Sequence, residues 1–595
     1  MNQRTRRPLS RLLPIRAACR VACGTLLVAA SLPAAMAATL TVDPTAADAA
    51  VAGDGKCSLR EAVLSVNAGA DVGDCVAVVT EAYGTNDTIV LPAGTYTLTR
   101  QGIDETYTDA NPADPATAPV VVNTPDATQG DLDLQKSVKI VGAGSASTVI
   151  EWNAELTGDR IFHVLANTGT VNVELQGVSV RNGSPQQVDI KAGPASGSGA
   201  LETRYYLRRA GGGMAVGPAA AIVLVDPNVT GDANAAGRGG SQRPDGGEES
   251  GATYSLKLTD VTVYNNSAQG DGGGIYTAGA MTMTRSTVRN NTGSTNGGGV
   301  YNEGNTTITA STIRDNTSEG GGGFFGTGSN SVTISGSTLS GNAAVGGGAI
   351  SGRAGVTMKI INTTISGNKG TDVGAGLYTN GSVQLIFVTI ANNLAGADSA
   401  DAGSGINLFP ATSSGSSVTL KNVLLSGNRK GWLPEMDAAA IAALPSANCG
   451  VTGSGLPVSS VASNLSSDAS CNGWLTSASD KKAVVALLGD LADNGGPTLT
   501  HALLAGSPAL GAGTADSEAT VDQRDTTRDA TPDIGAFELP ADVTSTPTAV
   551  DDGGGCTAAS GQRPVDPALP GMGLLALLAL GLRQVRRTRR AAGQR

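Results

Sequence analysis

Few residues of this 595-residue chain have side chains that commonly carry chemistry, and the cysteines are the most informative of them. Of the seven cysteines, Cys19 and Cys23 lie in a basic N-terminal leader. Four others form two pairs that would each close a short loop, as disulfides do in an oxidising compartment. These pairs are Cys57 with Cys75 and Cys449 with Cys471. A zinc site is the alternative, but there is no C-x-x-C spacing and both histidines lie far from these cysteines.

The titratable residues do not form an evident catalytic group. The two histidines, His163 and His501, lie outside the repetitive stretch from 254 to 430. A glycoside hydrolase needs two carboxylates on the same face of the protein. A polysaccharide lyase usually needs clustered aspartates that bind calcium and a basic residue that takes a proton. Asp271 and Asp315 fall at different places in the repeat. The sequence therefore predicts no catalytic residue, no metal ligand and no cofactor.

Two arginines have a spacing that could serve binding. Arg289 and Arg314 both stand two residues before an asparagine of the repeat, so we expect them to stack on neighbouring coils. Stacked guanidinium groups could contact an anionic glycan. The alternative interpretation is an ordinary solvated face.

The elements that would position these residues follow from a repeat of about 25 residues. The positions ten, eight and three residues before each repeated asparagine are nearly all apolar, which is the periodicity of short strands. Gly-rich turns separate the strands. The pattern predicts a right-handed parallel β-helix in which the asparagines form a structural ladder, the handedness following from the crossover rule. These asparagines are Asn266, Asn291, Asn316, Asn342, Asn368, Asn393 and Asn428.

Composition and charge agree with an exported β-solenoid. Glycine occurs 82 times and aromatic residues make up 3%, which excludes a thick aromatic core. Residues 1–37 and 571–595 each carry six arginines and no acid, so the chain between them has 51 acidic and 28 basic residues, a formal charge of −23. A body of that sign is not expected to bind nucleic acid.

Both ends read as targeting segments. Residues 1–37 combine basic residues, a short apolar run and an A-x-A site ending at Ala37, as in a secretory signal peptide that signal peptidase removes. An uncleaved membrane anchor is the alternative. The C-terminal end has Gly553, Gly554, Gly555 and Cys556, then an apolar segment at 569–582 and a cluster of arginines.

This C-terminal order resembles bacterial sorting signals of the GlyGly-CTERM kind. The resemblance implies a transmembrane helix that holds the chain in the membrane until an intramembrane protease of the rhombosortase kind removes the tail, and Cys556 resembles variants in which the cysteine is modified. A plain membrane tail is the alternative. The arginines after the apolar segment would stay on the cytoplasmic side of the membrane.

Two further segments carry family resemblances. Cys57-Ser58-Leu59-Arg60-Glu61-Ala62 and the later Asp87–Tyr96 phrase resemble the CSLREA domain, found at the front of exported bacterial β-helix proteins. We expect a short helix over 59–65 that caps the first coil, with Arg60 and Glu61 as a capping ion pair rather than catalytic groups. Residues 464–538 resemble the choice-of-anchor Q domain, which implies a structural role for His501.

The expected organisation is a signal peptide at 1–37, a CSLREA-like cap at 38–135, a β-helix at 136–430, a choice-of-anchor Q-like region at 431–540, a linker at 541–555 and a sorting signal at 556–595. An insertion at about 185–252 interrupts the helix, where Gly211–Met214 and Ala221–Val225 are expected to form one further coil.

The expected function is adhesion or glycan binding at the surface of a Gram-negative bacterium, associated with the outer membrane. The partner would be a glycan or a host surface. Many parallel β-helix enzymes act on uronate polymers, so a polysaccharide lyase or hydrolase acting on acidic glycans is the alternative, although a fold does not fix a function.

Overall fold

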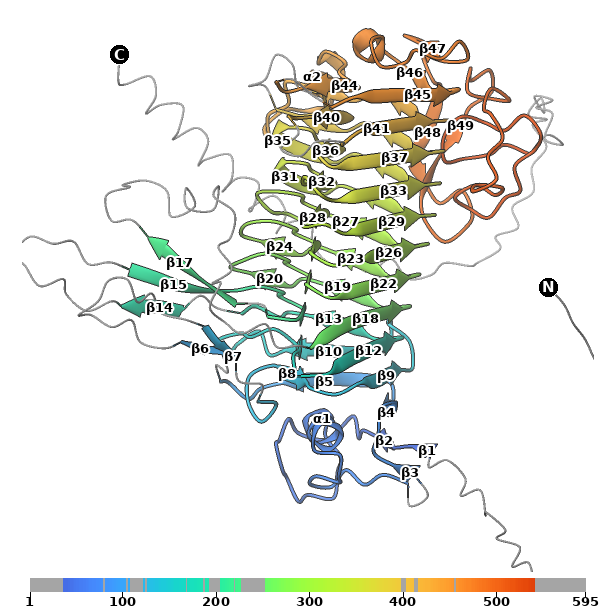
Figure 1. The fold of residues 1–595 in the computed structure, drawn as a ribbon. Helices are drawn as coiled ribbons and strands as arrows, with labels where there is room; N and C mark the ends of the chain where they lie inside the picture. Colours follow the sequence, from blue (N-terminus) through green and yellow to red (C-terminus); the bar gives the residue numbers. More distant parts are fainter. Residues whose placement is uncertain are drawn as a thin grey trace, which may run out of the picture.

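The predicted right-handed parallel β-helix is confirmed by a computed structural model of the protein (Figure 1). The structure describes residues 36–540, with gaps at 79–80, 103–104, 108–120, 124–125, 167, 186–187, 192–203, 219, 226–251, 397–402, 411–415 and 454–455. Successive coils stack from the N-terminal cap upward, and a complete coil gives one strand to each of the three long sheets. The three long sheets are called sheets 1, 2 and 3.

Sheet 1 has 12 strands. They are β2 (Thr39–Thr41), β4 (Asp87–Leu91), β9 (Val138–Gly142), β12 (Thr170–Gln176), β18 (Thr253–Thr259), β22 (Ala280–Thr284), β26 (Thr306–Thr309), β29 (Ser331–Ser335), β33 (Thr357–Ile361), β37 (Ser382–Ile386), β41 (Val418–Lys421) and β45 (Val458–Ala462).

Sheet 2 also has 12 strands, which follow those of sheet 1 along the chain. They are β5 (Gly94–Leu98), β10 (Thr148–Trp152), β13 (Ser179–Arg181), β19 (Thr262–Tyr264), β23 (Thr287–Arg289), β27 (Thr312–Arg314), β30 (Thr338–Ser340), β34 (Thr364–Ser366), β38 (Thr389–Ala391), β42 (Leu424–Ser426), β46 (Leu465–Ser466) and β47 (Lys481–Lys482).

Sheet 3 has 10 strands and completes each coil. They are β8 (Leu132–Leu134), β11 (Phe162–Val164), β16 (Met214–Val216), β21 (Ile275–Thr277), β25 (Val300–Asn302), β28 (Phe324–Gly326), β32 (Ile350–Gly352), β36 (Leu377–Thr379), β40 (Ile406–Leu408) and β44 (Cys449–Val451). Short strands widen the corner between sheets 2 and 3: β20 (Ser267–Ala268), β24 (Thr292–Gly293), β31 (Ala343–Gly346), β35 (Lys369–Val373), β39 (Leu394–Ala395) and β43 (Arg429–Lys430).

The core is a set of apolar columns inside the coil. Met281 and Met283 of β22 pair in register with Leu256 and Leu258 of β18, and all four side chains are buried. The alternate residues of each strand point outward, because successive side chains of a strand lie on opposite faces. Glycine is required at the corner before sheet 3: Gly297 has φ 65°, and a Cβ there would lie 2.5 Å from the Val300 carbonyl oxygen.

The coils extend past the interval 136–430 in both directions. Strands β4, β5 and β8 already belong to the three long sheets, as do β44, β45 and β46 at the other end. The helix α1 (Leu59–Ala68) begins at the N-cap Ser58, whose side chain accepts from the Glu61 amide in a capping box. It covers the first coil, below the rest of the helix in Figure 1.

The expected Arg60–Glu61 ion pair is wrong. Arg60 instead donates to Asp48 at 2.6 Å and to backbone carbonyls of the first coil, including that of Gly130 at 2.9 Å. Glu61 accepts from the backbone amides of Ser58 and Ala52. Adjacent helical residues point in different directions, so each of the two side chains reaches a different loop.

The insertion forms an antiparallel sheet rather than a second full coil. Gly211–Met214 leads into β16 of sheet 3, as expected. The prediction for Ala221–Val225 is wrong, because β17 (Ala220–Val225) pairs with β15 (Arg204–Arg209), which pairs with β14 (Val188–Lys191). This sheet projects from the helix beside the hairpin of β6 (Glu105–Tyr107) and β7 (Val121–Asn123) (Figure 1).

The C-terminal part of the described chain packs along the upper coils (Figure 1). Its hairpin consists of β48 (Leu488–Ala492) and β49 (Thr500–Leu503). The last coil carries α2 (Ala438–Ala443) and a short 3-10 helix over Ala469–Cys471, and β1 (Met36–Ala37) pairs with β3 (Glu81–Ala82) at the other end. No helix in the described ranges is long and apolar enough to cross a membrane, and the expected transmembrane segment at 569–582 lies outside them.

Candidate functional site

The repeated asparagines form one buried column at the corner that follows sheet 2. Each side-chain Nδ2 donates to the Oδ1 of the asparagine on the next coil at 2.8–3.0 Å, from Asn266 to Asn428. The left-handed backbone conformation belongs to the preceding residue, for example Asn265 and Asn290, both with φ 56°. The column is a structural feature, because every amide in it is occupied by protein partners.

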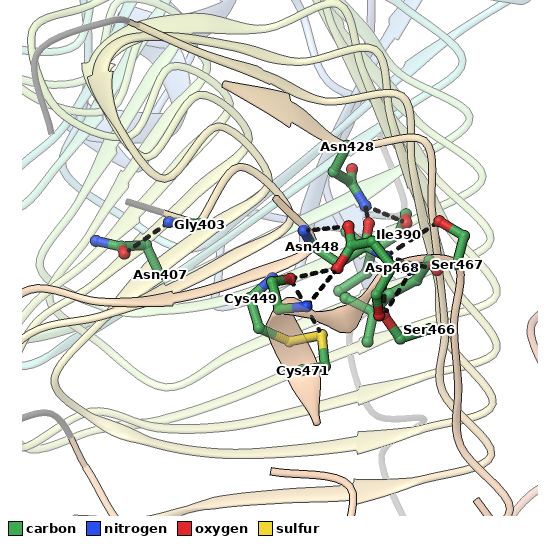
Figure 2. Close-up of a disulfide and its surroundings, with 12 residues drawn as sticks. Ile390, Gly403, Asn407, Asn428, Asn448, Cys449, Ser466, Ser467, Asp468 and Cys471 are labelled. Atoms are coloured by element: carbon green, nitrogen blue, oxygen red, sulfur yellow. Dashed lines mark hydrogen bonds between the residues drawn. A yellow bond between two sulfur atoms is a disulfide. The ribbon is translucent and has the colours of Figure 1, made fainter. Parts of the chain in front are cut away.

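The column continues one coil further than the repeat indicates. Asn428 donates to Asn448 at 2.8 Å, and the Asn448 amide donates to Asp468 at 3.0 Å (Figure 2). Asn448 follows Asn428 by only 20 residues, so the sequence spacing does not reveal it. The disulfide Cys449–Cys471 lies directly beside this end of the column.

The structure contains both disulfides expected from the sequence. Cys57–Cys75 joins the start of α1 to the loop that follows it, and Cys449–Cys471 ties the last coil to its 3-10 helix. Ala37, the expected cleavage position, ends β1. The expected sorting residues Gly553, Gly554, Gly555 and Cys556 lie outside the described residues.

A basic and aromatic row runs along the outer face of sheet 2, and we call it the arginine row. Register places its members on five consecutive strands. They are Glu151, Arg181, Tyr264, Arg289 and Arg314. Arg289 and Arg314 are therefore direct neighbours, as the sequence predicts. Arg181 and Tyr264 are 83 residues apart in the chain because of the insertion, so the repeat pattern did not reveal them.

Contacts along the arginine row fix its side chains. Arg181 donates to Glu151 at 2.6 Å and to the Tyr264 hydroxyl at 2.8 Å. The Arg289 guanidinium lies 4.3 Å from the Tyr264 ring centroid, a cation–π contact. Arg314 pairs with the exposed carboxylate of Asp315 at 2.5 Å. Parallel strands set the members about 4.8 Å apart along the helix axis.

An open groove of about 550 Å³ borders the arginine row. Its lining includes the buried Trp152 at the end of β10 and the polar residues Asn182, Ser184 and Asn265. Asn182 and Asn265 directly follow Arg181 and Tyr264 in the chain, so the groove lies at the corner beside the row. The amide and hydroxyl groups of this lining suit a polar ligand such as a sugar.

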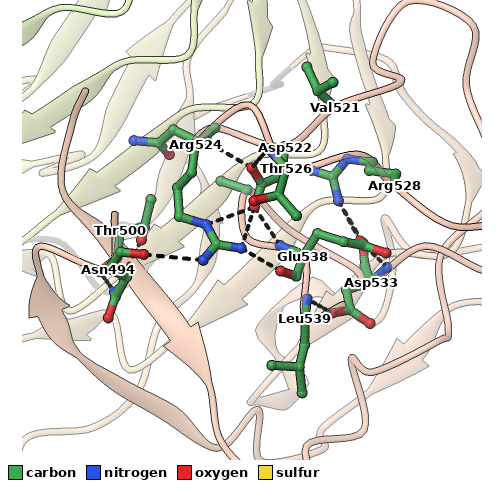
Figure 3. A network of polar contacts seen from close by, with 12 residues as sticks. Asn494, Thr500, Val521, Asp522, Arg524, Thr526, Arg528, Asp533, Glu538 and Leu539 are labelled. Atoms are coloured by element: carbon green, nitrogen blue, oxygen red, sulfur yellow. Dashed lines mark hydrogen bonds and ion pairs between the residues drawn. The ribbon is translucent and has the colours of Figure 1, made fainter. Parts of the chain in front are cut away.

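The C-terminal region contacts later strands of the same face, through Thr338, Thr364 and Thr389. His501 lies 2.8 Å from the Ser366 hydroxyl and 2.7 Å from the Gly489 carbonyl, and burial lowers its pKa. Its contacts show a structural role in docking. Arg524 and Arg528 bind Asp522 and Glu538 inside this region (Figure 3).

A second cluster of charged residues lies deep at the first coils, on the outer side of sheet 3. Its six residues are at most 2% exposed. Arg160 lies 3.3 Å from Asp131, and Arg209 lies 2.6 Å from Asp159. Sequence reasoning missed this group, which comprises Asp131, Asp133, Asp159, Arg160, His163 and Arg209. One sequence feature could have indicated this cluster. It is a charged residue between two apolar residues, as in Leu132-Asp133-Leu134.

The atoms of Asp131, Asp133 and His163 are close enough to hold a metal ion, being within 4.8 Å of one another. However, the Arg160 guanidinium lies 3.0 Å from His163 Nδ1, and the Gly217 carbonyl accepts at 3.1 Å from Nε2. Arginine only donates, so Nδ1 would accept from Arg160, while the Asp133 carboxylate lies 3.4 Å from the same nitrogen. A metal ion here would face a guanidinium, so the geometry fits an ion-pair network better than a metal centre.

Comparisons with known proteins agree with the fold. A family model for a right-handed β-helix region matches residues 273–454, and one for the Chlamydia polymorphic membrane protein repeat matches 260–278. No curated protein gives a significant match. Pectate lyase Pel9A is similar with a TM-score of 0.39 and 16% identity, covering 76% of this chain and 88% of that one.

A second solved structure is the A-module of the Azotobacter vinelandii mannuronan C-5 epimerase AlgE6. Its TM-score is 0.24 at 14% identity, covering 69% of this chain and 97% of that one. At these identities the likenesses concern the fold alone.

Proposed function

We propose that this is an exported surface protein that binds acidic polysaccharides along the arginine row and its groove, without cleaving them. The observation that carries the proposal is the register of Arg181, Tyr264, Arg289 and Arg314 on one face of sheet 2. Planar guanidinium groups bind carboxylates in a bidentate manner. Their repetition along the helix axis suits a linear polymer that carries a carboxylate on its sugars.

The negative charge of the protein limits where an acidic polymer can bind. The body carries a formal charge of −23, so it repels polyanions over most of its surface. An acidic polymer would therefore approach only where cationic side chains are concentrated. Binding of this kind weakens as salt rises, because exposed charges are screened within about 8–10 Å.

The geometry of the arginine row does not support glycoside hydrolysis. Its described carboxylates are Glu151, held by Arg181, and Asp315, held by Arg314. Four strand steps separate them, which is about 19 Å at about 4.8 Å per step. The two carboxylates of a glycosidase lie about 5–9.5 Å apart. The chain therefore supports binding here more than cleavage.

Export and surface attachment belong to the same proposal. The leader at 1–37 supports removal by signal peptidase, and the tail at 541–595 supports sorting by a rhombosortase-like protease at a Gram-negative outer membrane. The two disulfides are consistent with an oxidising compartment. The CSLREA and choice-of-anchor Q resemblances support the same order of segments.

The test replaces Arg289 and Arg314 together by glutamine. We expect affinity for polygalacturonate to fall about tenfold or more, since one hydrogen bond to a charged group contributes about 1.5–3 kcal/mol. The matched control is Lys139→Gln with Lys257→Gln, because both lysines contact Glu174 on sheet 1. Equal losses in the two double variants, or no loss in the first, would contradict the proposal.

A further inference from the structure

The outer face of sheet 3 carries two stacks of aromatic rings with one arginine between them. Tyr276, Tyr301 and Phe325 stack with centroids 5.4 and 5.3 Å apart and ring planes 7° from parallel. Tyr378 stacks on Phe409 at 4.3 Å. Arg353 follows β32, between the two stacks.

The Arg353 guanidinium is bordered by rings rather than by acceptors. Its Cζ lies 5.3 Å from the Phe325 centroid and 5.6 Å from that of Phe409. Burial is the main cause that lowers its pKa, while Tyr378 and Tyr301 oppose that shift. Within the described part of the chain, no carboxylate or carbonyl accepts a hydrogen bond from this side chain.

Three arginines that are more deeply buried than Arg353 have a different environment. Arg60, Arg209 and Arg528 all lie within 3.0 Å of a carboxylate oxygen. Arg353 is half-buried, and even partial burial of a cation without a paired anion has a cost. Arg353 lies over two ring faces, and no described acceptor takes a hydrogen bond from its N–H donors.

We propose that Arg353 anchors a second ligand site, which takes the carboxylate of a single sugar acid. The carboxylate would lie in the plane of the guanidinium and accept two parallel hydrogen bonds. The apolar side of the sugar would contact the half-buried Phe409. This site deepens the proposed glycan binding by naming its smallest ligand, and it lies on a different sheet from the arginine row.

The test measures binding of monomeric galacturonate to the exported protein by ligand-observed NMR, with galactose as the uncharged probe. We expect galacturonate to bind, galactose not to bind, Arg353→Met to lose the signal and Arg353→Lys to bind at least tenfold more weakly. Thermal unfolding should change little in Arg353→Met, because no described acceptor loses its partner. Undiminished galacturonate binding by that variant would overturn the site.

The experiments can disprove the arginine-row proposal and the Arg353 proposal independently of each other. The Arg289→Gln, Arg314→Gln protein should still bind monomeric galacturonate while losing the polymer. Loss of the monomer in that double variant would assign it to the arginine row instead of Arg353.

An independent observation concerns the first residue after the leader. The Ala38 amide is buried and lies 3.0 Å from Oδ1 of Asp87, which also accepts from the Gly84 amide. Asp87 is 1% exposed, and its burial raises the pKa of the carboxyl group. A buried carboxylate therefore faces the backbone nitrogen that cleavage after Ala37 would release.

We infer that leader removal creates an internal ion pair between the new N-terminus and Asp87. Hydrolysis of the Ala37–Ala38 peptide bond consumes one water, leaves a carboxylate on Ala37 and leaves an ammonium on Ala38. That ammonium stays where the amide was, because Thr39 and Leu40 remain paired in β2 with β4. The inference rests on cleavage after Ala37, which N-terminal sequencing of the exported protein checks separately.

The stability test compares a protein that begins at Ala38 with one that carries an extra glycine before it. An N-terminal ammonium has a pKa of about 8, which pairing raises, so its contribution is present at lower pH and lost as pH rises above that value. We expect hydrogen exchange of β2 at pH 6.5 to be about tenfold slower in the Ala38 protein. The difference should vanish at pH 10 and in Asp87→Asn. Equal exchange at pH 6.5 would overturn the inference.

Discussion

Replacing Asn342 by alanine is expected to reduce the free energy of unfolding by about 4 kcal/mol, since each buried polar group left without a partner costs about 1–3 kcal/mol. Its Oδ1 accepts from the backbone and side-chain nitrogens of Asn316, and its Nδ2 donates to Asn368 and to the Ile313 carbonyl. The side chain is 0% exposed, so water cannot replace these bonds. Urea unfolding followed by circular dichroism measures the loss.

The matched control lies on the same coil. Thr333→Ala changes an outward-facing residue of β29 and should cost less than about 1 kcal/mol, the span of strand propensities. If Asn342→Ala proves as mild as the control, the asparagine column is not what holds the corners of the coil.

Replacing Arg528 by methionine is the second large effect we expect, with a cost of about 3–5 kcal/mol because it leaves a buried charge unpaired. Arg528 donates to Glu538, to Asn362 on the coil and to the Gly535 carbonyl, each at 3.0 Å. Its guanidinium lies 3.8 Å from the Phe387 ring centroid (Figure 3 shows part of this network). It therefore joins the C-terminal region to the helix.

Limited proteolysis of residues 484–539 reports this docking directly. The Arg528→Met protein should be cut there much faster while the coils stay intact. Arg285→Met is the control, because Arg285 is exposed and pairs only with the exposed Asp260. Equal resistance of Arg528→Met and the natural protein would show that the region docks without this arginine.

The repeat predicted the fold because coil geometry constrains every inward side chain. Strands at a fixed offset from a corner asparagine must place apolar residues inside, so Met281 and Met283 were readable from sequence. The first and last coils were not, because loops of other lengths separate their strands while the corner geometry stays the same. Asn448 shows this, since it joins the column at an unusual spacing.

Periodicity could not distinguish a strand of the coil from a strand of the inserted sheet. It also could not distinguish exposed polar residues from buried ones. Ala221–Val225 is an apolar run that pairs antiparallel in the inserted sheet, although it reads like a coil strand. Asp133 and His163 occupy outward positions, which a pattern assigns to solvent, yet covering segments bury them. Two of the five members of the arginine row, Arg289 and Arg314, were predicted, and the other three depended on register across the insertion.

The central claim is that the protein binds acidic polysaccharide and leaves it intact. The most direct test follows binding of polygalacturonate and of its fully methyl-esterified form in parallel, at low and high salt, and counts new chain ends in both. We predict saturable binding of the free acid alone, weaker at high salt, with no new chain ends. Equal binding of the neutral ester, or the appearance of new chain ends, would contradict the account.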